Sequence, residues 1–431
     1  MAELKMPWPP SVEQKGLWKM PPGYFWQQGG VFLFDLHRTN PVRVAHDAVV
    51  LTERYIDHHD NVYCTIWYRR ESVWKSVVIP FNRMSSSVGY RDLKRAGVPL
   101  GAHPASRQFL LDWYSQNFSV LPVKAAVDQG GWLGRRDYAW GDRVIAPREI
   151  RDKALLVLSP TLKPWVVRQP VHPKEFRREW RWWIDEVLPT APYLVLGLAA
   201  VGAALLLERL HQPGFVMHIA GITSTGKTTT QMLLASLLGD PREVLGLVQK
   251  WSADTDELAE WTHWMKDSVW FLDDATRVSS RTIQDRLYWM TGGAAPGFRT
   301  NTRGIIISTS EHMLPVSGGG SARTLSWPTS WLDFGAPVDA WKEHVLRPAS
   351  WGWALPHLLE KVWQRSDREW LKAWRDHTTS RDNGVLQRWQ GYWNSLYVGA
   401  MLWPDDRIRK GVIRCENEWW ERRGEDGASN A

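Results

Sequence analysis

The sequence predicts an α/β protein with a parallel-sheet core, a strand-rich domain before it and a helical region after it. Three short apolar runs between about residues 170 and 330, "GFVMHIA", "VWFLDD" and "GIIISTS", end in polar residues and are separated by helix-forming segments. Such strands are typical of a parallel sheet that helices cover on both faces. Ligands bind these sheets at the carboxyl ends of the strands, so the chemistry is expected where the three runs stop.

Residues 1–167 are predicted to form the strand-rich N-terminal domain. Runs such as "DAVVLTERYI" and "NVYCTIWYRR" are β-branched or aromatic and are separated by turn formers, and the helical patch "HPASRQFLLDWYSQNF" follows them. The histidines of this segment lack the spacing of metal ligands, so we expect no catalytic centre here. The prolines of "LKPWVVRQPVHPKEF" break regular structure and place a domain boundary nearby.

The core is expected at 168–330 and opens with a basic aromatic helix. The apolar stretch Tyr193–Leu207 follows. It is shorter than the roughly 20 residues that a membrane span requires, so we expect a buried helix and no membrane partner. No apolar run follows the first charges, which predicts no signal peptide and a cytoplasmic protein. Residues 331–431 carry apolar side chains at helical spacing, which predicts a helical lid or extension.

The composition is that of an ordinary globular protein. Hydrophobic residues make up 44% and charged residues 23%, and the two cysteines, Cys64 and Cys415, form no disulfide or metal pattern. The formal net charge of +7 permits contact with nucleic acid without requiring it. The 30 tryptophans are the unusual feature. We expect most of these rings in the core, although indole faces beside arginines also stack on bases.

A phosphate-binding loop is predicted directly after the first core strand. Gly221-x-x-x-x-Gly226-Lys227-Thr228 matches the P-loop pattern, between an apolar strand and a helix-forming run. Loop N–H groups and the helix N-terminus suit phosphate, lysine suits the β- and γ-phosphates, and the threonine hydroxyl suits Mg²⁺. A tight glycine turn is the alternative. The expected ATP-binding residues are Gly221, Thr223, Ser224, Thr225, Gly226, Lys227, Thr228 and Thr229.

The ends of the other two strands supply the expected catalytic groups. Asp273 and Asp274 follow four apolar residues, as at a Walker B strand end. Asp273 is expected to hold Mg²⁺ with Thr228, and Asp274 to orient or deprotonate the attacking water, with Lys227 stabilising charge. The third strand ends in Ser308, Thr309 and Ser310, whose hydroxyls are candidates for sensing the γ-phosphate or holding that water. The sequence leaves open which hydroxyl does so and whether they only cap a loop.

Three arginines are candidates for contacts beyond this site. Arg323 lies at the exit of the glycine run Gly318–Gly320, where a ring ATPase places an arginine finger that reaches the neighbouring nucleotide. Arg299 and Arg303 are its rivals. Their loop precedes the third strand, and they are also the expected DNA-binding residues, because arginines in a central channel track phosphates without reading sequence. An ordinary solvated hairpin is the alternative.

Together these segments resemble a known family. The chain is similar to the P-loop ATPases named as domain of unknown function nine-two-seven, helicase-like AAA+ modules of phages, plasmids and chromosomal islands. The resemblance is carried in the core by "GITSTGKTTTQMLLASLLGDP", "WSADTDELAEW", "VWFLDDA", "IIISTSE" and "SARTLSWP", upstream by "PPGYFWQQGGVF", "LKRAGVPL" and "QGGWLG", and downstream by "GWALPHLLE" and "RWQGYWNSLYVGAMLW". It implies an AAA+-type fold for the parallel-sheet core.

The sequence departs from the family pattern at three places. The family has Asp-Glu where Asp273 and Asp274 stand. It has a Gly-x-Gly-Lys-x-Arg-like stretch where "TGGAAPGFR" lacks the lysine, so a phosphate or DNA contact there passes to Arg299 or Arg303 or is lost. The sensor segment is Ser-Thr-Ser-Glu instead of Ser-Thr-Gly-Glu.

The resemblance implies an ATP-driven DNA helicase or translocase acting in replication of a phage or mobile element. The expected partners are single-stranded DNA, bound independently of sequence, a ring of identical copies (a hexamer) with shared ATP sites, and a separate primase or polymerase. A second hypothesis is an ATP-switched loader that recruits a replication partner without unwinding DNA. A small-molecule kinase, a defence ATPase and a packaging motor are further alternatives. The acidic pair and the long helical C-terminus weigh against the kinase.

Overall fold

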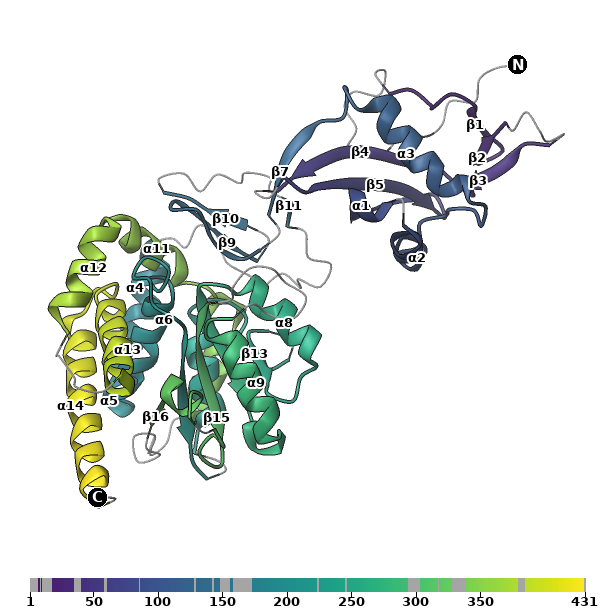
Figure 1. Ribbon diagram of the computed structural model, residues 1–431. Coiled ribbons are helices and arrows are strands. Elements are labelled where there is room, and N and C mark those ends of the chain that lie inside the picture. Colours follow the sequence, from purple (N-terminus) through teal and green to yellow (C-terminus); the bar gives the residue numbers. More distant parts are fainter. Residues whose placement is uncertain are drawn as a thin grey trace. The chain divides into compact units, whose positions relative to one another are not determined.

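The fold is mixed α/β, with a parallel sheet and a helical C-terminal region (Figure 1). The computed structural model divides into two compact units, Met1–Asp128 with Lys153–Pro160, and Gln129–Asp152 with Thr161–Ala431. The described residues are Pro7, Pro9, 18–34, 40–57, 60–84, 86–127, 129–141, 143–147, 156–157, 173–222, 225–244, 246–293, 303–316, 318–327, 338–378 and 384–429.

Residues 129–152 and the C-terminal helices thus lie in one compact unit with the parallel sheet. The division into 1–167, 168–330 and 331–431 stays a prediction.

In the described part of the first unit, two sheets pack with three helices. One sheet is antiparallel, in the order β1 (Tyr24–Gln27), β2 (Gly30–Leu33), β3 (Val42–Ala45). The other runs in the order β11 (Leu156–Val157), β7 (Val123–Val127), β4 (Val49–Ile56), β5 (Val62–Arg70), β6 (Val73–Pro80). The helices are α1 (Phe81–Met84), α2 (Ser87–Arg95) and α3 (Ala105–Asn117).

Helix α3 closes the core of this first unit. It lies along the sheet that contains β4 (Figure 1). Trp113 is fully buried, and its indole N–H donates to the backbone oxygen of Leu51 at 3.0 Å. A buried N–H with a partner removes the cost of an unsatisfied donor, so this bond fixes the helix against the strand.

The second unit is organised by a five-stranded, all-parallel sheet. Its order is β13 (Val248–Lys250), β14 (Ser268–Asp273), β15 (Gly304–Ser310), β12 (Phe215–Ala220), β16 (Thr324–Trp327). The strands are buried almost throughout, as expected for a sheet covered on both faces. Strand β14 is not beside β12, because β15 lies between them.

Helices flank this sheet on both sides, with α8 and α9 on one side and α6 and α13 on the other (Figure 1). The helices of the unit are α4 (Pro173–Trp182), which continues as the π-helical turn η2 (Trp183–Val187), α5 (Leu188–Thr190), α6 (Leu194–Ala204), α7 (Lys227–Ser236), α8 (Thr255–Trp264), α9 (Ser280–Met290), α10 (Val338–Val345), α11 (Leu355–Trp363), α12 (Asp367–Asp376), α13 (Gly384–Ala400) and α14 (Asp406–Ser429). The described residues of the unit also form the short 3-10 turns η3 (Ala275–Arg277), η4 (Ser321–Arg323) and η6 (Pro348–Ser350).

The apolar stretch forms helix α6, and every residue of that helix is buried, which confirms the expectation. Gly202 of α6 faces the backbone of Gly399 in α13, and Gly399 faces the backbone of Ala199 and Ala203, at a separation that leaves no room for a side chain. The C-terminal helices therefore pack directly on the core. Within the described residues, no helix has the length and apolar character needed to cross a membrane.

A small antiparallel sheet packs against the segment that leads into β14. It consists of β8 (Gly131–Leu133), β9 (Asp137–Trp140) and β10 (Arg143–Ile145). Gly130 lies against the backbone of Trp264, and Gly131 against that of Lys266 and the carboxylate of Asp267. The two glycines of "QGGWLG" are therefore required for close backbone approach to the segment that leads into β14.

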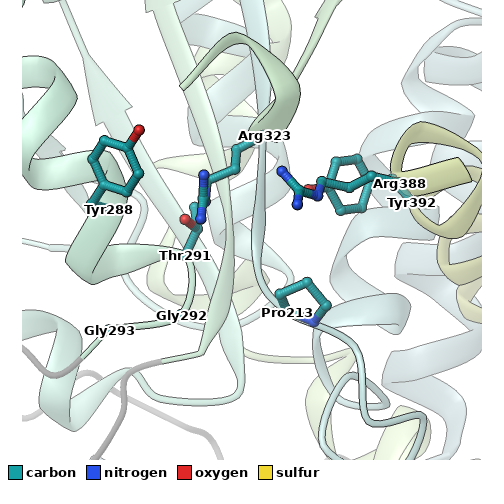
Figure 2. Close-up of a pocket in the computed structure, with 8 residues that line it drawn as sticks. All are labelled: Pro213, Tyr288, Thr291, Gly292, Gly293, Arg323, Arg388 and Tyr392. Atoms are coloured by element: carbon teal, nitrogen blue, oxygen red, sulfur yellow. The ribbon is translucent and has the colours of Figure 1, made fainter. Parts of the chain in front are cut away.

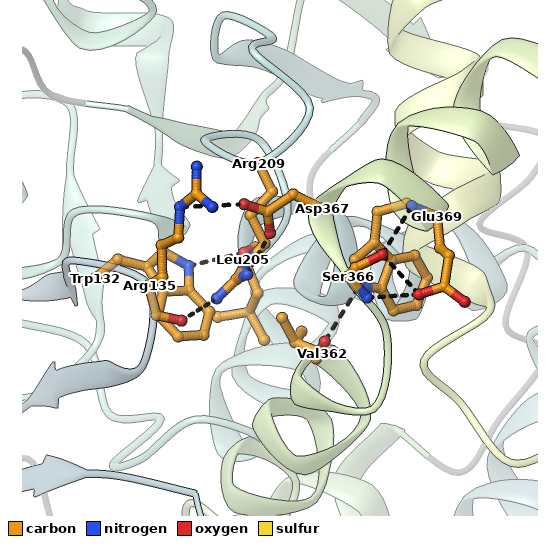
Figure 3. Close-up of polar contacts among 9 residues, drawn as sticks. Trp132, Arg135, Leu205, Arg209, Val362, Ser366, Asp367 and Glu369 are labelled. Atoms are coloured by element: carbon orange, nitrogen blue, oxygen red, sulfur yellow. Dashed lines mark hydrogen bonds and ion pairs between the residues drawn. The ribbon is translucent and has the colours of Figure 1, made fainter.

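Polar contacts hold this small sheet to the helices (Figure 3). The Trp132 indole donates to the backbone oxygen of Leu205 at 2.8 Å. The guanidinium of Arg209 contacts the Asp367 carboxylate at 2.5 Å and the backbone oxygen of Arg135 at 2.7 Å, and it lies over the Trp132 ring. Because Arg209 is largely buried, this ion pair links the β8–β9 turn, the end of α6 and the start of α12.

Replacing Gly131 by alanine is expected to lower the free energy of unfolding by about 3 kcal/mol, because strain and overpacking add. Its φ is +81°, and a methyl group there would lie 2.5 Å from the Lys266 oxygen. Gly134→Ala is the matched control, since its φ is +72° and nothing lies within 4 Å. That variant should lose only about 1 kcal/mol. Urea unfolding followed by tryptophan fluorescence measures both, and equal losses would contradict the packing argument.

Candidate nucleotide site

The predicted phosphate loop joins β12 to α7 at the carboxyl edge of the parallel sheet. The Gly221 N–H donates to the Ser310 backbone oxygen at 3.1 Å, so the loop starts beside the end of β15. Gly226 precedes α7 with a φ of +79°, a left-handed conformation that favours glycine. Thr229, in the first turn of α7, is buried. Thr223 and Ser224, two of the predicted binding residues, lie outside the described residues.

Lys227 folds back across its own loop. Its ammonium donates to the backbone oxygens of Gly221 and Ile222, each at 2.6 Å, and lies 3.5 Å from the Thr225 hydroxyl. Partial burial lowers the pKa of Lys227, while the carboxylates of Glu311, Asp273 and Asp274 oppose that shift. The nearby carboxylates therefore favour the charged ammonium. Its present hydrogen bonds to loop carbonyls are of a kind that phosphate oxygens could replace.

The structure brings the predicted metal ligands together. The Thr228 hydroxyl lies 3.3 and 3.4 Å from the two carboxylate oxygens of Asp273. Among the described residues, no group of three His, Cys, Asp or Glu side chains could hold a metal ion. Two oxygen ligands fit Mg²⁺, which usually keeps several waters and takes phosphate oxygens as its other ligands. Thr228 and Asp273 thus fit an ion that arrives with a nucleotide.

Strand β15 contributes one of its three candidate hydroxyls to this site, that of Thr309, whereas the Ser310 hydroxyl lies against His218. Thr309 is fully buried, and its hydroxyl donates to Asp273. Ser308 faces the other way, accepting from the Trp251 indole at 2.8 Å and lying 3.0 Å from His218 Nδ1. Alternation along a strand explains the difference, because neighbouring residues point to opposite faces. The structure thus places Thr309, and not Ser308, beside the metal ligand.

Asp274 lies next to this group in an unusual backbone conformation. Its φ is +54°, and its carboxylate accepts the Thr276 N–H at 3.3 Å, capping η3. Aspartate tolerates the left-handed region better than most residues. Glu311, the residue after β15, is exposed and close enough to influence Lys227. Glu311 is not among the site residues predicted from the sequence, where the only signal is an acidic residue directly after Ser-Thr-Ser.

Gln231 is a second residue that the sequence analysis missed. It is fully buried one turn beyond Lys227, and its amide donates to the backbone oxygens of Leu272 at 3.0 Å and Ile307 at 2.9 Å. One side chain therefore ties α7 to both β14 and β15. A glutamine among the apolar residues of "TQMLLASLL" was the available signal.

Arg303 and Arg323 lie away from this edge of the sheet. Arg323 ends η4 just before β16, at the amino end of the strands. Arg303 precedes β15 at that same end, and its backbone oxygen accepts the Asp267 N–H at 2.7 Å. Arg299 lies outside the described residues. Within one chain, neither Arg303 nor Arg323 shares the edge where Lys227 and Asp273 meet.

A buried histidine supports the strand that leads to the loop. His218 of β12 lies 3.0 Å from the His312 backbone oxygen and 3.1 Å from the Ser310 hydroxyl, in addition to its contact with Ser308. Burial lowers the pKa of His218 to about 4, so the ring is neutral at pH 7. A neutral ring with a partner for each nitrogen joins β12 and β15 without a buried charge.

The family model described as Domain of unknown function (DUF927) matches residues 30–306. A comparison with curated proteins finds no match. A solved structure described as "SCCmec type IV Cch - active helicase" is similar over 94% of this chain and 78% of its own, with a TM-score of 0.61 and 14% identity. At this identity the likeness shows a shared fold.

Acidification is expected to destabilise the protein through His218. The unfolded chain binds a proton below about pH 6.5, whereas the folded His218 does so only near 4, so stability is lost as pH falls through that window. The loss is about 3 kcal/mol. His218→Gln should remove that part of the slope in urea unfolding measured from pH 7 to pH 4.

The wild-type and His218→Gln proteins must be compared with each other, because two other groups titrate. Burial also lowers the pKa of His357 to about 4, and it raises the pKa of Asp267 to about 7, which acts in the opposite direction. Parallel curves for the two proteins would contradict the assignment to His218.

Proposed function

The chain belongs to the DUF927 family, and from this membership and the site geometry we propose that it is an ATP-dependent DNA helicase or translocase of a phage or mobile element. In this proposal the second unit is an AAA+-type P-loop core that acts in DNA replication. The observation that carries the proposal is the meeting of Lys227, Thr228, Asp273 and Thr309 at one edge of a parallel sheet. The fold shared with a helicase structure supports it.

The residues of this edge have the chemistry that ATP and Mg²⁺ require. The loop N–H groups and the N-terminus of α7 would hold the phosphates, with Lys227 turning from its loop carbonyls toward them. Thr228 and Asp273 would hold Mg²⁺, whose chemistry is to neutralise charge on the phosphate oxygens. Thr309 fixes the Asp273 carboxylate, and Asp274 would orient the attacking water.

The place of Arg323 favours sites shared between copies. Thr324 pairs with Val216, so Arg323 is level with Phe215, six residues before Gly221. At 3.3 Å per residue that is about 20 Å from the phosphate loop. At that distance the Arg323 guanidinium cannot contact a nucleotide bound by its own chain. It could contact one bound by a second copy, as in a ring. We propose a hexamer with Arg323 acting between copies.

The DNA contact is assigned to the opposite edge of the sheet. Arg303 lies there, and Arg299 precedes it in the same connection. Arginine contacts with phosphates supply affinity that does not depend on sequence and that weakens as salt rises. Single-stranded DNA is therefore the proposed polymer, with a separate primase or polymerase as a further replication partner.

An ATP-switched loader is the second candidate, and one observation favours it. The Asp274 carboxylate caps the η3 turn, and aspartate is one methylene shorter than the glutamate of the family pattern. A water-orienting group held in this way predicts slow hydrolysis. ATP hydrolysis that DNA does not stimulate, together with ATP-dependent binding of a replication protein, would favour the loader.

Lys227→Ala is expected to lower ATP hydrolysis by at least about 100-fold, because the charge that faces the phosphates is lost. Wild-type activity should rise on addition of single-stranded DNA. Arg323→Ala should lose hydrolysis while still binding ATP. A DNA-titrated ATPase assay with native mass measured alongside tests all three, and full activity of a monomer would contradict the shared site.

Thr309→Val and Ser308→Ala separate the roles of two neighbouring hydroxyls of β15. Losing the Thr309 hydroxyl should lower kcat about tenfold, since Asp273 loses a charge-assisted hydrogen bond. Losing the Ser308 hydroxyl should leave kcat within about twofold but cost about 1–3 kcal/mol of stability, because His218 and Trp251 lose a buried partner. Equal kinetic effects would contradict the assignment.

A further inference from the structure

A pocket of about 380 Å³ lies at the amino edge of the parallel sheet, away from the phosphate loop (Figure 2). Its walls come from the end of α9, from η4 and from α13, which supply Tyr288 and Thr291, Arg323, and Arg388 with Tyr392. It therefore joins the proposed arginine finger to a C-terminal helix that the nucleotide site does not use.

The pocket is strongly cationic. Two arginines line it, and among the described residues no aspartate or glutamate does. Within that part of the chain, no ion pair joins Arg323 or Arg388 to a carboxylate. Figure 2 shows both guanidinium groups pointing into the same hollow from opposite walls. Two like charges held in this way repel, and a multiply charged anion between them would turn the repulsion into attraction.

Arg323 is positioned by its own contacts, and Arg388 by the packing of the helix that carries it. Arg323 donates to the Gly319 backbone oxygen at 2.7 Å and lies over the Tyr288 ring, 4.7 Å from its centroid. On the other wall, the Tyr392 ring stacks on Phe215 at 4.4 Å, and its hydroxyl donates to the Ala322 oxygen at 3.4 Å. These contacts hold α13 against β12 and η4 and so bring Arg388, one turn before Tyr392, to face Arg323.

We propose that Arg388 and Arg323 together bind the terminal phosphate of a nucleotide held by a second copy of this chain. Arginine is suited to this role, because its planar fork donates two parallel bonds to phosphate oxygens. The two cations line one pocket from opposite walls, which suits a single phosphate group. A DNA backbone would instead require cations in a row, one for each successive phosphate. The inference rests on the proposed function and adds a second arginine to the shared site.

The experiment compares ATP hydrolysis by the wild type, Arg323→Ala, Arg388→Ala, Arg388→Lys and the control Arg375→Ala. Arg375 is exposed on the neighbouring helix α12 and does not line the pocket, so its variant loses the same charge elsewhere. Arg388→Ala should lower kcat about 10- to 100-fold with ATP binding unchanged, the size expected for charged hydrogen bonds. Arg388→Lys should retain part of the activity, and Arg375→Ala all of it.

Mixing variants tests whether the pocket acts between copies. In a mixture of Lys227→Ala and Arg388→Ala, the second protein supplies the phosphate loop and the first supplies both arginines. The mixture should hydrolyse ATP faster than the sum of its parts. No gain on mixing, or an Arg388→Ala protein as active as Arg375→Ala, would overturn the inference while the wild-type ATPase upheld the proposed function.

Two further outcomes distinguish the phosphate source and the underlying proposal. If Arg388→Ala weakens salt-dependent binding of single-stranded DNA but leaves hydrolysis without DNA intact, the pocket serves DNA phosphates and the inference is wrong. If native mass measurement shows that the wild type assembles, and the assembly hydrolyses no ATP, the proposed function is wrong. The shared phosphate site is then wrong as well.

Discussion

The candidate site depends on one constraint, the insertion of β15 between the strand that leads to the phosphate loop and the strand that ends in the acidic pair. Because the three strands are parallel and adjacent, their carboxyl ends meet at one edge. Gln231 reinforces this order, since its single amide bonds to β14 and β15 from α7. The distance between Thr228 and Asp273 is therefore set by backbone pairing and one buried side chain, and does not rely on flexible loops.

The rest of the second unit is attached through close backbone approach and buried indole donors. Gly202 and Gly399 let α6 and α13 touch, and Gly130 lets the small sheet reach the segment before β14. Indole N–H groups of Trp132, Trp140 and Trp403 then donate to the backbone oxygens of Leu205, Leu238 and Leu198. Each of these large rings excludes water while its indole donor keeps a hydrogen-bond partner.

Much of the candidate nucleotide site could be predicted from the sequence, because its signals are local. A glycine-rich loop, a lysine and an acidic pair after an apolar run each lie within a few residues, and parallel strands bring such ends together. The choice between Ser308 and Thr309 could not be made, since it depends on which face of β15 meets Asp273. Arg388 gave no signal, because its meeting with Arg323 depends on how α13 packs against η4, across 65 residues of chain. Thr223, Ser224 and Arg299 lie outside the described residues, and their roles remain predictions.

The separation of Lys227 and Arg323 onto opposite edges of one sheet has a consequence for symmetry. A contact that joins these two edges is directional, so a two-fold axis cannot generate it, and copies must add head to tail. An open row of such copies always has one more phosphate loop than completed junctions, whereas a closed circle has equal numbers. Closure of the ring would therefore give the last unpartnered phosphate loop an arginine from a neighbouring copy. The specific activity per subunit would then depend on whether the assembly is open or closed.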